Sequence, residues 1–209
     1  MINAAHEGDL RTVKRLQNEL SVAVDGTKFA KAADAAMRTF LDFRDPRFHG
    51  TAVFESAAED RLEVVRMLHQ LRADLDKPNK EMGATPSTIA AQEGHRAMVQ
   101  LLYDLGADVH RARNNGARPI HAAAVEGRNG TLFLLLSLRA STDQIDGIGR
   151  TPLIYAAIAG YTSCVRVLCE IRSDVHYVSK EGGTAAQYAI QIGGKMLNET
   201  LAVLKEYGA

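Results

Sequence analysis

The chain has 209 residues, and 25 Lys plus Arg balance 25 Asp plus Glu, so its formal net charge at pH 7 is zero. This balance argues against a protein that binds nucleic acid mainly through phosphate contacts, because such a protein needs a basic excess. Hydrophobic residues make up 46% of the chain and charged residues 24%, which argues against wholesale disorder. Trp is absent and Ala is abundant, so we expect thin layers of closely packed helices.

The sequence shows no membrane or secretory segment. Its longest uncharged apolar run, near residues 131–138, is far shorter than the roughly 20 residues that a membrane span needs. The first seven residues lack the basic and apolar parts of a secretory signal, which favours an intracellular, cytoplasmic location or a processed chain. Cys164 and Cys169 lie five residues apart on one expected helix and point in different directions, so we expect neither disulfides nor a metal site.

Three series of small residues recur at a spacing of 33 along most of the chain. One series consists of Gly50, Gly83, Gly116, Gly149 and Gly182. A second consists of the pairs Ala57-Ala58, Ala90-Ala91, Ala123-Ala124 and Ala156-Ala157. The third consists of Gly94, Gly127, Gly160 and Gly193. Such a period is typical of a stacked repeat architecture.

Each period has the same physical pattern. A glycine turn leads to Thr-Pro or a variant of it, and proline is well suited to the first turn of a helix. A short helix with small Ala residues follows and ends at a glycine of the third series, which fits a left-handed cap. A second helix then carries paired Val and Leu residues. The pattern predicts a small helix that lets its neighbours approach and a bulkier second helix.

These motifs resemble the ankyrin repeat. The closest copy is Gly83-Ala84-Thr85-Pro86-Ser87-Thr88-Ile89-Ala90-Ala91, followed by Gly94-His95 and Gly106-Ala107-Asp108-Val109. The resemblance implies an all-α solenoid of about six stacked helix-turn-helix units with short β-hairpin-like loops. Of the histidines that the family carries in its turn, His121 alone is present, because the other units have Thr88, Ile154 and Gln187. Part of the hydrogen bonding between repeats should therefore be lost.

The register divides residues 1–209, taken as one domain, into units. We expect an N-terminal cap unit at 1–21, a helical insertion at 22–48, repeats at 49–81, 82–115, 116–148 and 149–181, and a C-terminal cap repeat at 182–209. We expect both end units to be natural ends of the repeat stack. Apolar residues at steps of three and four predict an amphipathic helix over residues 27–43. Its Phe29, Phe40 and Phe43 either pack onto the first units or form a docking surface.

No set of residues predicts catalysis or a bound cofactor. We find no Ser-His-Asp or Cys-His combination in which each member has a role. Gly147-Ile148-Gly149 is not expected to be a dinucleotide loop, since Pro152 follows and no strand precedes it. His110 and His176 occupy the same loop position two units apart, too far for a shared metal, and are expected to be solvated. We therefore expect that the protein is not an enzyme.

The resemblance implies a concave binding face made of hairpin tips and first helices. Carried over position by position, the expected contact residues are Met82, Glu93, Asn115, Val125, Glu126, Ile148, Arg150, Ile158, Lys180 and Ile192. These residues include both acidic and basic side chains, and those at the centre of the face are apolar. The apolar residues are either scattered surface residues or a groove for an apolar peptide or helix. Phe133, at a normally polar position of an outer helix, either packs under a loop or forms a second docking point.

The sequence therefore favours a non-catalytic protein-protein interaction module, such as an adaptor, an inhibitor or an accessory subunit. Its partner would be another protein and not nucleic acid. Two alternatives stay open. The chain could be a structural subunit permanently embedded in a large multiprotein assembly, with the insertion and Phe133 as extra contacts. It could also be a regulatory segment of a larger enzyme or channel.

Overall fold

The computed structural model describes residues 50–193 and 195–209, which form ten α-helices and no β-strand. The helices are α4 (Ala52–Ala58), α5 (Leu62–Gln70), α6 (Pro86–Glu93), α7 (Arg96–Asp104), α8 (Pro119–Val125), α9 (Asn129–Ser137), α10 (Pro152–Ala159), α11 (Thr162–Glu170), α12 (Ala185–Ile192) and α13 (Lys195–Glu206). The expected cap unit, the insertion and Phe29, Phe40 and Phe43 lie outside the described residues.

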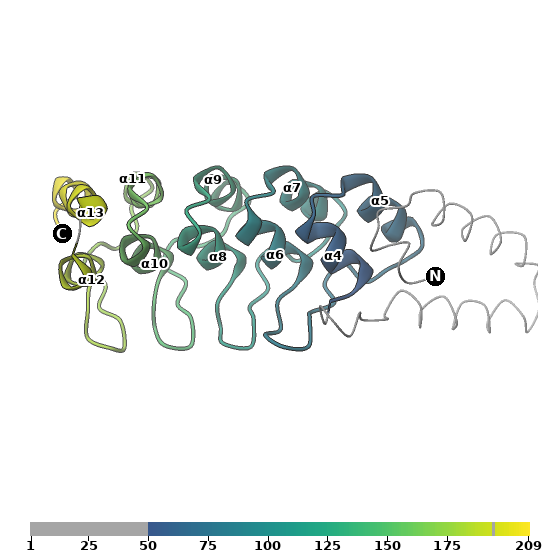
Figure 1. Ribbon diagram of the computed structural model, residues 1–209, viewed down its shortest axis with the longest axis horizontal. Coiled ribbons are helices and arrows are strands. Elements are labelled where there is room, and N and C mark those ends of the chain that lie inside the picture. Colours follow the sequence, from purple (N-terminus) through teal and green to yellow (C-terminus); the bar gives the residue numbers. More distant parts are fainter. Residues whose placement is uncertain (1–49, 194) are drawn as a thin grey trace, which may run out of the picture.

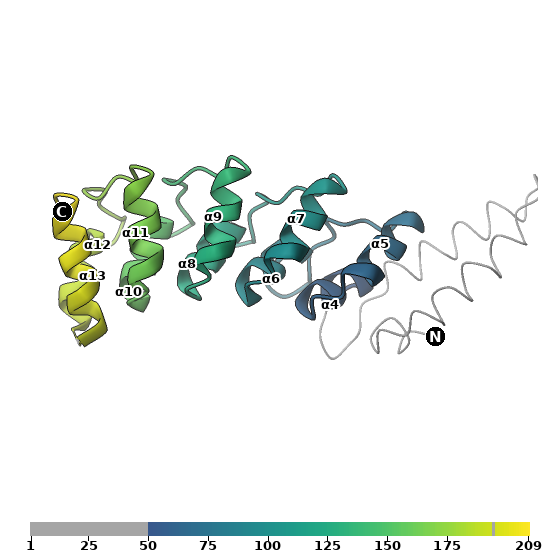
Figure 2. The same cartoon turned by 90° about the horizontal axis from the view of Figure 1, so that it is seen from above.

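The helices form an elongated stack of pairs (Figures 1 and 2). The first helices of the pairs (α4, α6, α8, α10, α12) form one layer, and the second helices (α5, α7, α9, α11, α13) form another. Each first helix packs against the first helix of the next pair, and the connecting loops project beyond that layer (Figure 1). The all-α solenoid is the fold that the repeat pattern predicted.

Local signals explain where the first helices begin and end. The hydroxyls of Thr51, Thr85, Thr151 and Thr184 each accept the backbone N–H of the residue three positions on, at 3.2–3.3 Å. The helix α8 differs, because Arg118 stands at its N-cap position without a side-chain cap. Left-handed glycines, Gly94 (φ 84°) and Gly160 (φ 74°), end α6 and α10 as expected. The expected left-handed cap is absent at Gly193, whose ψ is 177°, and the C-cap of α8 is Glu126, one residue before Gly127.

The core consists of small residues on the first helices and larger ones on the second. Ala90, Ala123 and Ala156 are fully buried where first helices stack, and Leu102 and Leu135 are fully buried on the second helices. Alanine permits a close approach of helices at native packing density. The composition, rich in Ala and poor in aromatics, follows from this stacking.

The repeat register shifts by one residue in the first described pair. The N–H of His95 bonds to the carbonyl of Ala90, whereas the equivalent N–H of Arg61 bonds to Ser56. Ser56 therefore occupies the position of Ala90, and the inclusion of Ala57-Ala58 in the 33-residue series was wrong by one residue. The shift arises in the turn, because Gly50-Thr51 lacks the residue that Ala84 supplies between Gly83 and Thr85.

Histidines connect successive pairs. His110 is half-buried, and its Nε2 donates to the carbonyl oxygen of Leu138 at 2.9 Å, so the expectation that it is solvated was wrong. His121 bonds to the carbonyl of Gln144 in the next loop at 2.9 Å. Thr88, at the equivalent position, bonds instead to Thr85 of its own unit at 2.9 Å. This agrees with the expected partial loss of bonds between repeats.

Candidate functional site

The expected contact surface includes the tips of the projecting hairpins. Each hairpin is closed by backbone bonds, such as Arg113 N–H to the carbonyl of Ala117 at 2.7 Å. A polar side chain inside the hairpin then fixes the tip. The buried carboxylate of Asp146 accepts the N–H groups of Ile148 (3.1 Å) and Arg150 (2.9 Å). In two further hairpins, Asn79 Oδ1 accepts the N–H of Ala84 at 2.9 Å and Ser179 Oγ accepts that of Glu181 at 3.2 Å. The tips are therefore held in defined conformations.

Neighbouring tips are also joined to one another. The N–H of Asn114 donates to the carbonyl of Met82 at 3.0 Å, and that of Gly147 donates to the carbonyl of Asn115 at 2.7 Å. At the next junction, Lys180 Nζ donates to the carbonyl of Gly147 at 3.0 Å. These contacts link four successive tips into one row.

A polar and aromatic cluster surrounds Arg150. Its Nε and Nη2 donate to Glu181 of the next tip at 3.0 and 2.5 Å, and its guanidinium lies 5.3 Å from the ring centre of Tyr188 and 5.8 Å from that of Tyr155. The Tyr155 hydroxyl donates to the Asp146 carboxylate at 2.6 Å. Burial, followed by this bond, raises the pKa of Tyr155 to about 12. The bond from Arg150 lowers the pKa of exposed Glu181.

The expected contact residues differ in their exposure to solvent. Met82, Ile148 and Ile192 are large apolar side chains exposed by 53%, 44% and 52%. Val125 and Ile158 are half-buried. The polar members Glu93, Asn115, Glu126 and Lys180 are exposed, and Arg150 is half-buried in its cluster. Met82, Asn115 and Ile148 each precede a positive-φ glycine, so they share one position in successive tips.

Comparison with known proteins decides the family. The family model for ankyrin repeats, in three copies, matches residues 1–113, 52–146 and 120–209. The chain belongs to the ankyrin-repeat family. An ankyrin repeat and KH domain-containing protein of Caenorhabditis briggsae is 40% identical over 55 residues, which is 26% of this chain and 2% of that protein. The chain thus matches only a small part of that relative.

Ankyrin repeats indicate a protein-protein interaction module, and the family is typically non-catalytic. Burial raises the pKa of the Cys164 and Cys169 thiols to about 11, so both are protonated at neutral pH. In the part of the chain that the structure describes, no group of three His, Cys, Asp or Glu side chains is arranged to hold a metal. Each helix in that part is too short or too polar to cross a bilayer.

Several partners of the expected contact residues were not predicted from the sequence. Tyr155 and Tyr188 are two of them, although their spacing of 33 places them in equivalent positions. Arg113 is another, a half-buried side chain whose Nη2 donates to Gln92 Oε1 at 2.9 Å and which faces the charge of Glu126. The spacing of the tyrosines was a usable signal. The position of Arg113 depends on how two units stack, so no local motif reveals it.

Phe133 lies on the second-helix layer, away from the hairpin tips. It is exposed by 56%, so it does not pack under a loop. The equivalent residues of the neighbouring helices are polar, Gln100 on α7 and Arg166 on α11. Tyr103 on α7 is exposed by 46% on the same layer. The ankyrin repeats thus carry exposed aromatic side chains on the second-helix layer.

Proposed function

We propose that this chain is a non-catalytic binding module that holds an apolar peptide or helix of another protein along its concave face. The observation that supports this proposal is the linked row of tips, which carries Met82 and Ile148. Ile192 at the end of α12 is a further exposed apolar residue. All three side chains are more than two-fifths exposed. Exposed apolar side chains gathered on one face are typical of interaction sites. An adaptor, an inhibitor and an accessory subunit would all use such a face.

The charges on the same face suggest how the partner is oriented. Glu93 at the end of α6 and Glu126 at the end of α8 occupy one position, and Ala159 and Ile192 replace them in the following units. This position at the ends of the first helices therefore changes from acidic to apolar along the stack. A bound segment would place basic side chains near α6 and α8 and apolar side chains near α10 and α12, since complementary charges favour association.

A second candidate function is a structural subunit of a large assembly. Exposed Phe133 and Tyr103 on the second-helix layer favour it, because they offer an apolar contact independent of the concave face. The docking role of Phe29, Phe40 and Phe43 stays a prediction.

A photo-crosslinking amino acid at position 148 would test the proposal by capturing the partner, which is then purified. Its affinity is measured for the wild type, for Ile148→Asp with Ile192→Asp, and for the control Phe133→Asp. Burial of an isoleucine contributes about 1.5–3 kcal/mol, so the double variant should bind at least about 100-fold more weakly. The control should bind like the wild type. Loss of binding by the control alone would instead support the structural subunit.

A further inference from the structure

Arg118 departs from the pattern of the other described repeats. The first helices α4, α6, α10 and α12 have a threonine at the N-cap, and its hydroxyl accepts a backbone N–H. At α8, Arg118 takes this place, and an arginine side chain has no acceptor with which to cap a helix. The substitution thus removes a stabilising local interaction. A departure of this kind from a local rule is typical of a functional position.

The guanidinium of Arg118 has hydrogen-bond donors that the described residues do not satisfy. Nη1 donates to the carbonyl oxygen of His110 at 2.6 Å. This bond holds the half-buried Arg118 side chain against the loop that follows α7. Nε is buried and has no hydrogen-bond partner among the described residues. A buried cationic donor without an acceptor is costly, because it has lost its hydration. A negatively charged group beside it would reduce that cost.

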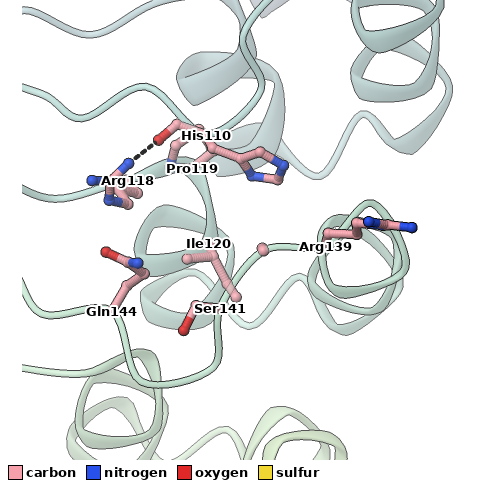
Figure 3. Close-up of a pocket in the computed structure, with 8 residues that line it drawn as sticks. His110, Arg118, Pro119, Ile120, Arg139, Ser141 and Gln144 are labelled. Atoms are coloured by element: carbon pink, nitrogen blue, oxygen red, sulfur yellow. Dashed lines mark hydrogen bonds between the residues drawn. The ribbon is translucent and has the colours of Figure 1, made fainter.

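A cavity of about 180 Å³ lies beside this guanidinium, between the loops that follow α7 and α9 (Figure 3). Its lining residues are His110, Arg118, Pro119, Ile120, Arg139, Ala140, Ser141 and Gln144. Two of the eight are arginines and none is acidic. Asp143 lies nearby in sequence, and its Oδ1 accepts the N–H of Asp174 from the following loop at 3.1 Å. The lining is therefore positively charged.

The polar side chains of the lining offer donors to a bound group. Figure 3 shows the Arg118 guanidinium and the Gln144 amide on the same side of the cavity, with the Ser141 hydroxyl below them and the Arg139 guanidinium extending away. Neither Ser141 nor Gln144 makes a side-chain hydrogen bond within the described residues, so both can donate to a ligand. The Nε2 of His110 is already engaged with Leu138. Arg139 contributes charge at the rim.

We propose that this cavity binds an oxyanion carried by a partner protein, either a carboxylate or a phosphorylated side chain. Arg118 supplies the positive charge that suits such a group, and Gln144 and Ser141 supply neutral donors. The volume exceeds the roughly 30 Å³ of one water molecule and suits a group of phosphate size. The site uses the bases of two hairpins, whereas the proposed concave contacts use their tips. It is a second anchor that does not depend on the apolar face.

The test is a titration of the ¹⁵N-labelled chain with inorganic phosphate at constant ionic strength and pH 7, followed by the amide signals of Arg118, Ser141 and Gln144. A parallel titration uses acetate. Saturable shifts with both anions support a carboxylate or a phosphate, and shifts with phosphate alone support a phosphorylated partner. The absence of saturable shifts with either anion would overturn the proposal.

The variant Arg118→Thr restores the threonine of the other units, so its melting temperature should not fall. It should bind phosphate at least about tenfold more weakly, since it loses the charged donor. Arg118→Lys keeps the positive charge and should bind phosphate more tightly than Arg118→Thr does. The control Arg96→Thr removes the same charge from the exposed start of α7 and should leave binding unchanged. Unchanged binding by Arg118→Thr, or an equal loss in the control, would refute the site.

Discussion

His121 Nε2 donates a hydrogen bond to the carbonyl oxygen of Gln144 at 2.9 Å and thereby joins α8 to the loop before α10. The other ring nitrogen, Nδ1, accepts the backbone N–H of Arg118 at 3.1 Å. Because a backbone N–H can only donate, the ring is neutral with its proton on Nε2. The side chain is 2% exposed, and Tyr155 contacts it edge to face.

This arrangement makes the free energy of unfolding dependent on pH. Burial lowers the pKa of His121 below its ordinary value of 6.5. The unfolded chain therefore takes up a proton that the folded chain excludes, and the stabilisation is complete above about pH 6.5 and decreases as the pH falls toward the folded pKa. Urea unfolding of the wild type and of His121→Gln from pH 7.5 to 5 should show a flatter profile for the variant. Parallel profiles would contradict this explanation.

The close contact between hairpin tips predicts the effect of a methyl group at position 147. A Cβ on Gly147 would lie 2.8 Å from the carbonyl oxygen of Asn115, so Gly147→Ala should lower the free energy of unfolding by about 1–3 kcal/mol. A control is Gly130→Ala on α9, where a Cβ meets no atom within 4 Å. That change should raise the stability by about 0.5–1 kcal/mol through helix propensity. Thermal melts of both variants would check these opposite signs.

The bond from Tyr155 to Asp146 predicts an alkaline transition. The pKa of Tyr155 is raised to about 12, against an ordinary 10, so its contribution to stability is present below pH 10 and is lost as the pH rises through 12. Ultraviolet titration of the phenolates should lose its latest step in Tyr155→Phe. The same variant should be less stable by about 1–2 kcal/mol at pH 7, because Asp146 loses a donor. Tyr103→Phe, at an exposed position, should leave the latest step and the stability at pH 7 unchanged.

Two nearby residues of α9 should differ sharply in their cost of truncation. Leu135 is fully buried, so Leu135→Ala should lower the free energy of unfolding by about 2–5 kcal/mol. Phe133 is 56% exposed, and Phe133→Ala should cost less than about 1 kcal/mol. Chemical denaturation of both variants measures the difference. A large loss at Phe133 would show that its ring packs on the protein more than its exposure indicates.

Part of the candidate site could be predicted from sequence. The tip position of Met82, Asn115 and Ile148 follows from the glycine that succeeds each of them, because a positive-φ glycine sets the turn. The partners of Arg150 could not be predicted, since Glu181 is 31 residues away and reaches Arg150 only when two units stack. The bond from His110 to Leu138 escaped prediction for the same reason.

The amino-acid sequence by itself determined the repeat, the order of the helices and where most of them begin and end. These features depend on contacts between residues three or four positions apart, such as the bond from Phe54 N–H to Thr51, and such contacts form with the turn itself. Only the tertiary structure decided which tips touch, which cationic side chains are half-buried and where a cavity forms. Those features depend on the distance and rotation between stacked units, which contacts between residues about 30 positions apart determine.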